Sequence, residues 1–178
     1  MIITISGKPG SGKSTVAKEL AKKLNLKYYS IGDLMGRIAL EKKISLLQLS
    51  KIAEHDESID KELDQKQIQL GKTKDNFVID SRLGFYFIPN SIKVFLDVSL
   101  EEGAKRIFKT KRADEKENIS LNDTIKNIKK RIKSEKKRYK KYYGIDHYDK
   151  KNYDIIIDTT KRDVKQVVRI ILDKIRKL

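Results

Sequence analysis

The sequence predicts an α/β fold built around a phosphate-binding loop, and three neighbouring segments lead to this prediction. Residues 2–6 are mostly β-branched and apolar, which is typical of a buried strand. Residues 7–14 are glycine-rich and fit the pattern G-x-x-x-x-G-K-[ST]. Residues 16–24 carry apolar side chains at the spacing of an amphipathic helix. A strand, the full motif and a helix in this order predict a P-loop NTPase fold.

The loop itself is predicted to hold phosphates with its backbone. Glycines leave the N–H groups unobstructed, and the positive end of the helix dipole faces the anion. We expect Lys13 to reach the terminal phosphates and Ser14 to bind Mg²⁺. A chance glycine-rich turn is the alternative, and the combined context disfavours it. The residues expected to bind the nucleotide here are Gly7, Lys8, Pro9, Gly10, Ser11, Gly12, Lys13, Ser14 and Thr15.

Length and composition indicate one domain. The chain has 178 residues and no cysteine, which excludes disulfides and thiolate metal sites. It contains no apolar run of 18 residues, and Met1 leads directly into the first expected strand. We therefore expect a soluble, cytoplasmic protein without a membrane partner, and a monomer.

Positive charge is concentrated in the second part of the sequence. The net charge is +16, of which residues 1–102 carry +2 and residues 103–178 carry +14. Such a basic half attracts nucleotides or nucleic acid, or forms a solvated lysine-rich surface. Lysine outnumbers arginine, so we expect no nucleic-acid partner.

Helices are expected to interrupt the alternation of strands after residue 30. A short strand at 26–29 is followed by helical stretches at 33–43, 45–52 and about 58–70. The segment 31–75 is predicted to be an acceptor-binding insert, with a plain helical decoration as the alternative. The core is then formed by residues 1–30, 76–108 and 145–178.

Two apolar strands, at 76–80 and 92–97, each end in an aspartate. Ligands of open α/β sheets bind at the carboxyl ends of strands, so either Asp80 or Asp97 could lie near Mg²⁺. Arg82 follows Asp80, and this favours Asp80, acting through water. The alternative is an aspartate that caps a turn.

A charged segment at 109–119 lies between two expected helices, one at 100–110 and one beginning at Ser120. It has almost no large apolar side chains, so burial alone cannot hold it closed. We expect either a lid over bound phosphates or an inert surface loop, and the position favours the lid. Arg106 and Arg112 are predicted to meet ATP phosphates when it closes.

The helix that begins at Ser120 ends at Gly144, and it places Arg131, Glu135 and Arg138 on one face. From the residues alone, this face is either a surface salt-bridge ladder or part of the site. A last strand at 153–158 and a closing helix at 164–178 complete the fold. His55 and His147 lack metal-ligand spacing and are assigned no role.

Together these pieces resemble the small P-loop nucleoside monophosphate kinases, and most closely the compact archaeal-type cytidylate kinases. The resemblance covers nearly the whole chain. The segments that carry it are Gly7 to Ser14, Ser30-Ile31-Gly32-Asp33-Leu34-Met35, Ile79-Asp80-Ser81-Arg82-Leu83-Gly84, Arg131 to Tyr139, and Tyr142-Tyr143-Gly144-Ile145-Asp146.

This resemblance implies a five-stranded parallel sheet, ATP and Mg²⁺, and phosphoryl transfer to the nucleoside monophosphate CMP or dCMP. It implies that Arg131 and Arg138 reach phosphates and that Glu135 reaches the acceptor's sugar hydroxyls. The residues it implies for catalysis are Lys13, Arg82, Arg131 and Arg138. Those implied for the acceptor are Ser30, Gly32, Asp33, Arg37, Asp80, Arg82, Arg131, Glu135 and Arg138.

Two positions depart from the family pattern. The family often carries arginine where this chain has Gly36, and Arg37 follows one position later. One position rotates a helical side chain by about 100°, so Arg37 substitutes only if the helix start is displaced. Ser81 replaces a glycine that is common in its turn. The alternatives are a P-loop kinase for AMP, UMP or a small metabolite, and an ATP-dependent nucleic-acid-binding protein.

Overall fold

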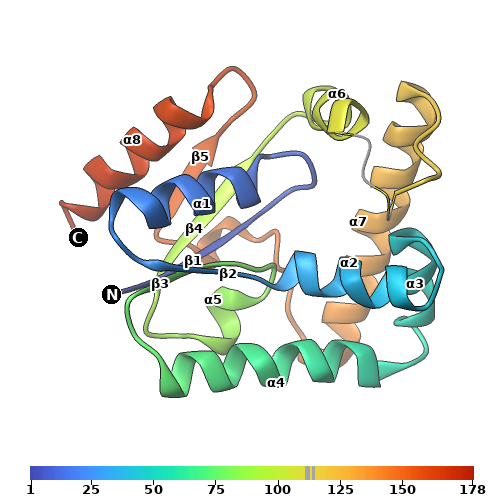
Figure 1. The fold of residues 1–178 in the computed structure, drawn as a ribbon, viewed down its shortest axis with the longest axis horizontal. Coiled ribbons are helices and arrows are strands. Elements are labelled where there is room, and N and C mark those ends of the chain that lie inside the picture. Colours follow the sequence, from blue (N-terminus) through green and yellow to red (C-terminus); the bar gives the residue numbers. More distant parts are fainter. Residues whose placement is uncertain (111–112, 114) are drawn as a thin grey trace.

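A computed structural model of the chain describes residues 1–110, 113 and 115–178. Its centre is a five-stranded sheet in the order β2-β3-β1-β4-β5. Every adjacent pair of strands is parallel, so the predicted parallel sheet is confirmed (Figure 1). The strands are β1 (Ile2–Gly7), β2 (Lys27–Ser30), β3 (Phe77–Asp80), β4 (Ile92–Asp97) and β5 (Ile155–Asp158).

Helices connect the strands and cover the sheet. The short helix α5 and the 3₁₀ turn η1 were not predicted, because neither is long enough to show a hydrophobic period in the sequence. The helices of the described residues are α1 (Lys13–Lys23), α2 (Ile31–Glu41), α3 (Leu46–Ile52), α4 (Glu57–Thr73), α5 (Gly84–Phe87), α6 (Leu100–Thr110), α7 (Leu121–Tyr143), η1 (Lys150–Asn152) and α8 (Val164–Ile175).

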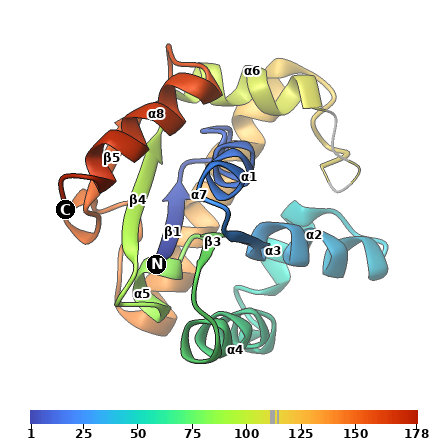
Figure 2. The same ribbon diagram turned by 60° about the vertical axis from the view of Figure 1, so that its left-hand side comes forward.

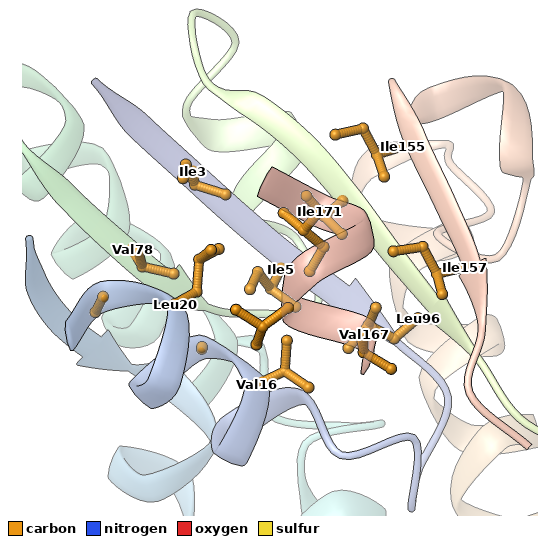
Figure 3. Close-up of a cluster of buried hydrophobic side chains, with 14 residues drawn as sticks. Ile3, Ile5, Val16, Leu20, Val78, Leu96, Ile155, Ile157, Val167 and Ile171 are labelled. Atoms are coloured by element: carbon orange, nitrogen blue, oxygen red, sulfur yellow. The ribbon is translucent and has the colours of Figure 1, made fainter. Parts of the chain in front are cut away.

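The main hydrophobic core lies between the sheet and the helices α1 and α8. Ile3 and Ile5 of β1 meet Leu20 of α1 and Ile171 of α8, and all four are fully buried (Figure 3). Burying such side chains contributes about 1.5–3 kcal/mol each, so this core fixes the strand that leads into the phosphate-binding loop. A second core, on the opposite face, joins β4 to α5 and α7 through Phe85, Phe95 and Tyr139 among others.

Capping residues set the helix ends. Ser30 is both the last residue of β2 and the N-cap of α2, where it accepts a hydrogen bond from the backbone N–H of Asp33. Helix α2 therefore begins two residues earlier than the expected start at residue 33. Ser120 caps α7 in the same way, and Gly144 ends α7 in the left-handed conformation that glycine adopts without strain.

The helices α2, α3 and α4 lie together on the opposite side of the molecule from α8, as both ribbon views show (Figures 1 and 2). Helix α3 packs against α7, and α4 packs against α5. The segment between β2 and β3 therefore meets the C-terminal half of the chain at α7. No helix among the described residues is long and apolar enough to cross a membrane.

Candidate functional site

The loop between β1 and α1 has the geometry of an anion-binding turn. Gly10 and Gly12 have φ values of 77° and 86°, a region that side chains disfavour. A Cβ at Gly7 would lie 2.2 Å from the carbonyl oxygen of Leu96, and one at Gly10 would lie 2.3 Å from that of Gly103. The close approach of neighbouring backbone therefore requires glycine at both positions.

Lys13, at the first turn of α1, is surrounded by charges. Its Nζ donates to the carbonyl of Lys8 at 3.1 Å, inside the loop. Burial and the nearby Arg82 lower the pKa of Lys13 to about 8, although Asp80 acts in the opposite direction. Ser14 follows, and its hydroxyl donates to the carboxylate of Asp80 at the end of β3. The structure thus brings Lys13, Ser14, Asp80 and Arg82 to one edge of the sheet.

A cleft of about 590 Å³ opens in front of this edge. Residues of the phosphate-binding loop, of α6 and of α7 line it, together with Gly32 and Asp33 of α2. Of the residues predicted to bind substrates, those that line this cleft are Pro9, Gly10, Ser11, Gly12, Lys13, Ser14, Thr15, Gly32, Asp33, Asp80, Arg82, Arg106 and Arg131.

A buried carboxylate holds the two cleft arginines from behind. Oε1 of Glu135 lies 2.6 Å from Nε of Arg82 and 3.1 Å from Nε of Arg131. Burial alone would raise the pKa of Glu135, but the two arginines hold it well below its ordinary value. Glu135 is only 2% exposed, so the alternative of a solvated salt-bridge ladder on this face is wrong.

Glu135 is buried and is not among the residues that line the cleft, and protein groups already contact both of its carboxylate oxygens. Its Oε2 accepts from the hydroxyl of Tyr148 at 3.2 Å, and Nε2 of His147 lies 3.7 Å away. The structure therefore gives His147, to which the sequence assigned no role, a place behind this carboxylate. Contact of Glu135 with a sugar hydroxyl, as the resemblance implied, requires this cluster to rearrange.

Other predicted residues do not line the cleft or lie outside the described residues. Nζ of Lys8 pairs with Asp97 at 2.7 Å, so Asp97 neutralises a lysine rather than facing Ser14. Ser30 and Arg37 line a separate cavity of about 520 Å³ between β2, α2 and α4. Because the arginine stands at position 37 and not at position 36, it lines this separate cavity and not the cleft at the phosphate loop. Arg112 lies outside the described residues.

Arg106 of α6 lines the cleft, and protein groups hold its guanidinium. It pairs with Glu102 at 2.9 Å and donates to the carbonyl of Thr159 at 2.8 Å and to the hydroxyl of Thr159 at 3.2 Å. In this arrangement Arg106 connects α6 to the segment after β5. The predicted contact of Arg106 with ATP phosphates would require these hydrogen bonds to exchange.

Helix α4 carries a buried polar cluster that was not predicted from the sequence. Asp60, Asp64 and Gln67 are all at most 7% exposed and lie one turn apart on the helix. Asp64 accepts from the hydroxyl of Tyr143 and from the amide of Gln67, and burial raises its pKa to about 7. The helical spacing could have predicted the burial of this cluster, because positions 60, 64 and 67 adjoin the apolar positions Ile59 and Leu63 on the inward side of the helix.

A parallel sheet with this loop at its carboxyl edge, and an arginine-lined cleft in front of it, define a P-loop phosphate-binding protein of the kinase type. The described structure resembles solved P-loop kinases in fold. The shikimate kinase from Acinetobacter baumannii has a TM-score of 0.64 at 15% identity and covers 99% of this chain and 93% of its own. A protein from Eubacterium ventriosum reaches a TM-score of 0.73 at 24% identity, covering 100% and 99%.

The chain belongs to the cytidylate kinase-like family, which residues 2–161 match. The cytidylate kinase of Sulfurisphaera tokodaii is 39% identical over 173 residues, which are 96% of this chain and 93% of that protein. The cytidylate kinase of Methanocaldococcus jannaschii is 39% identical over 183 residues, covering 100% and 99%. The resemblance read from the sequence is therefore confirmed.

Proposed function

We propose that this protein transfers the γ-phosphoryl group of ATP to CMP or dCMP, giving CDP or dCDP and ADP. The observation that carries the proposal is full-length similarity to cytidylate kinases, joined to a phosphate loop that faces Arg82 and Arg131 across one cleft. Phosphoryl transfer needs positioning and charge stabilisation more than a covalent partner, and a cleft rich in cations supplies both.

Different residues of the site would bind the phosphates of the donor and the phosphate of the acceptor. Backbone N–H groups of the loop and Lys13 would hold the donor's β- and γ-phosphates. Arg82 and Arg131 would hold the acceptor phosphate, because both line the cleft and Glu135 fixes both from behind. Two guanidinium groups next to Lys13 would neutralise the charge on the transferring group without moving during the reaction.

The residues present also suit Mg²⁺. Ser14 and Asp80 supply hard oxygen atoms and already contact each other beside the loop. No cluster of three metal-ligating side chains exists in the described part of the chain, so water and phosphate oxygens would complete the coordination. Ser14 would bind the ion directly and Asp80 through water, and the ion would help to neutralise the phosphates.

The helices α2 to α4, within residues 31–75, are proposed to be the acceptor-binding insert, because Gly32, Asp33 and Leu46 from α2 and α3 line the cleft. That the protein is a monomer stays a prediction. The segment 109–119 stays a predicted lid, and residues 111, 112 and 114 of it lie outside the described residues.

ATP binding is expected to weaken above pH 8. The pKa of Lys13 is about 8 in the free protein, so Lys13 loses its charge as the pH rises through that value. Phosphates favour the charged form, hence the apparent Kd for ATP should increase by about tenfold per pH unit above pH 8. Equilibrium binding at pH 7, 8 and 9 measures this. Lys13→Arg, which keeps its charge, is the control and should show a flat profile, and an equally steep one would contradict the assignment.

The proposal is tested by initial rates with ATP and single acceptors. We expect CMP and dCMP to be phosphorylated with kcat/KM at least about tenfold above those of UMP and AMP, in the range of discrimination that a polar base site supplies. A faster reaction with AMP, UMP or shikimate would show that the protein is a kinase but would contradict the assignment of CMP or dCMP as its acceptor. ATP turnover without any phosphorylated acceptor would overturn both.

A further inference from the structure

A histidine that follows α7 is buried behind the cleft with incomplete hydrogen bonds. His147 is 0% exposed, and neither of its ring nitrogens has a hydrogen-bond partner among the described residues. Such groups are rare, because a buried polar atom without a partner destabilises the folded protein. The ring nevertheless has a fixed place, with its centroid 4.8 Å from that of Tyr139 and 3.9 Å from that of Tyr148. The hydroxyl of Tyr153 also donates to the backbone carbonyl of His147 at 2.6 Å.

One edge of this ring faces the carboxylate of Glu135. Nε2 of His147 lies 3.7 Å from Oε2 of Glu135, just beyond hydrogen-bond distance. The hydroxyl of Tyr148 donates to the same oxygen at 3.2 Å, while Arg82 and Arg131 contact the other oxygen. A carboxylate oxygen accepts about two hydrogen bonds, so Oε2 has room for one more donor. Nε2 of His147 is placed to be that donor.

The charge state of the ring decides what it can donate. Burial lowers the pKa of His147 below its ordinary value, although the carboxylate of Glu135 acts in the opposite direction. Arg82 and Asp146 also act on this pKa, and their effects are of opposite sign. The ring is therefore neutral near pH 7 and carries a single N–H group. A neutral ring can donate to Glu135 only when that hydrogen is on Nε2, and the negative charge of Glu135 favours this tautomer.

This contact bears on the cleft because Glu135 holds both arginines that would bind the acceptor phosphate. A phosphate that enters the cleft competes with Glu135 for the guanidinium groups of Arg82 and Arg131. Glu135 stays buried and charged, so a weaker hold on the arginines is unfavourable unless another donor compensates for it. Hydrogen bonds in active sites are often long in the free enzyme and shorten in the complex.

We propose that His147 is a positioning residue for the acceptor phosphate. Its Nε2–H group donates to Glu135 when the acceptor binds, and thereby keeps Glu135 aimed at Arg82 and Arg131. The proposal rests on the proposed function of these two arginines and adds a side chain that touches neither substrate. It also gives a reason for a polar ring among tyrosines, because its unpartnered nitrogens destabilise the free protein but support acceptor binding.

Two substitutions of this residue separate positioning from packing. In His147→Gln the amide nitrogen takes the place of Nε2, whereas His147→Leu fills a similar space without a donor. We expect His147→Leu to raise the KM for CMP by at least about tenfold, as for one lost hydrogen bond to a charged group, with the KM for ATP within about threefold of wild type. His147→Gln should keep both constants within about threefold. An unchanged KM for CMP in His147→Leu, or an equal increase in both variants, would overturn the proposal.

Thermal stability distinguishes this effect from a folding defect. Leucine removes two buried polar atoms that have no partner, so the melting temperature of His147→Leu should equal or exceed that of wild type. A higher KM for CMP in a protein of undiminished stability would support the positioning role. His55→Gln is the matched control, because His55 is exposed, and it should change neither KM.

The tautomer of His147 gives a test that uses the wild-type protein alone. The chain has only two histidines, so the spectrum of His147→Gln assigns both rings in nitrogen NMR correlations. We expect the ring of His147 to carry its hydrogen on Nε2 at pH 7, and hydrogen on Nδ1 alone would overturn the proposal. If wild type does not phosphorylate CMP, the proposed function fails. If it does, and His147→Leu keeps the wild-type KM for CMP, only the role of His147 fails.

Discussion

Replacing Lys13 with alanine is expected to lower kcat/KM by at least about 1,000-fold, which corresponds to about 4 kcal/mol of transition-state stabilisation. Lys13 lines the cleft, and among the described residues its ammonium group donates to one loop carbonyl, that of Lys8. It is therefore free to turn to the γ-phosphate, where negative charge must be neutralised during transfer. Steady-state kinetics with ATP and CMP measure the loss.

The fold should survive this substitution. The Lys13 ammonium group loses solvation through burial and repels Arg82, so removing it should leave the melting temperature within about 2–4 °C of wild type. Lys22→Ala, on the exposed last turn of the same helix, serves as a matched control for charge loss. Turnover of Lys13→Ala within tenfold of wild type would contradict the assignment of the phosphate loop.

Arg131→Met is expected to reduce kcat/KM for the acceptor by at least about 100-fold, or about 2.7 kcal/mol. Arg131 lines the cleft while Glu135 at 3.1 Å and Glu115 at 3.0 Å hold its guanidinium, so its direction is fixed before substrate arrives. Methionine keeps the apolar stem and removes the charge. Because Arg82 still pairs with Glu135, the variant does not leave that carboxylate without a cation.

Two measurements separate this effect from a structural one. The KM for CMP should rise together with the fall in kcat, because Arg131 would hold the acceptor phosphate before and during transfer. Lys133→Met, two residues along the same helix, should change neither constant by more than about threefold, as expected for a solvated lysine. If Arg131→Met lowers only the thermal stability and leaves both constants unchanged, the role of Arg131 is to stabilise Glu135 and not to bind the acceptor phosphate.

Local patterns were sufficient to predict the scaffold of the site. The glycine spacing, Lys13 and Ser14 are set by a short segment whose neighbours along the chain determine its conformation. Asp80 and Arg82 were predicted correctly to share an edge with the loop, because the carboxyl ends of parallel strands converge. The approximate ranges of the strands and of the longer helices were predicted from apolar runs and caps, although α2 begins two residues earlier than expected.

The sequence could not show which side chains face each other across the interior. Arg131 and Arg138 share a helix face, yet one lines the cleft and the other is buried against Asp60, more than 70 residues earlier in the chain. That pairing depends on how α4 packs beside α7, which no local pattern encodes. The same applies to His147, whose position behind Glu135 follows from the turn after α7.

The central claim is tested most directly by following the labelled γ-phosphate of ATP in a mixture of equal concentrations of CMP, UMP and AMP. The account predicts that the label appears in CDP, with ADP formed in equal amount, and that Lys13→Ala abolishes the transfer. Label found mainly in UDP, in ADP or in inorganic phosphate would contradict it.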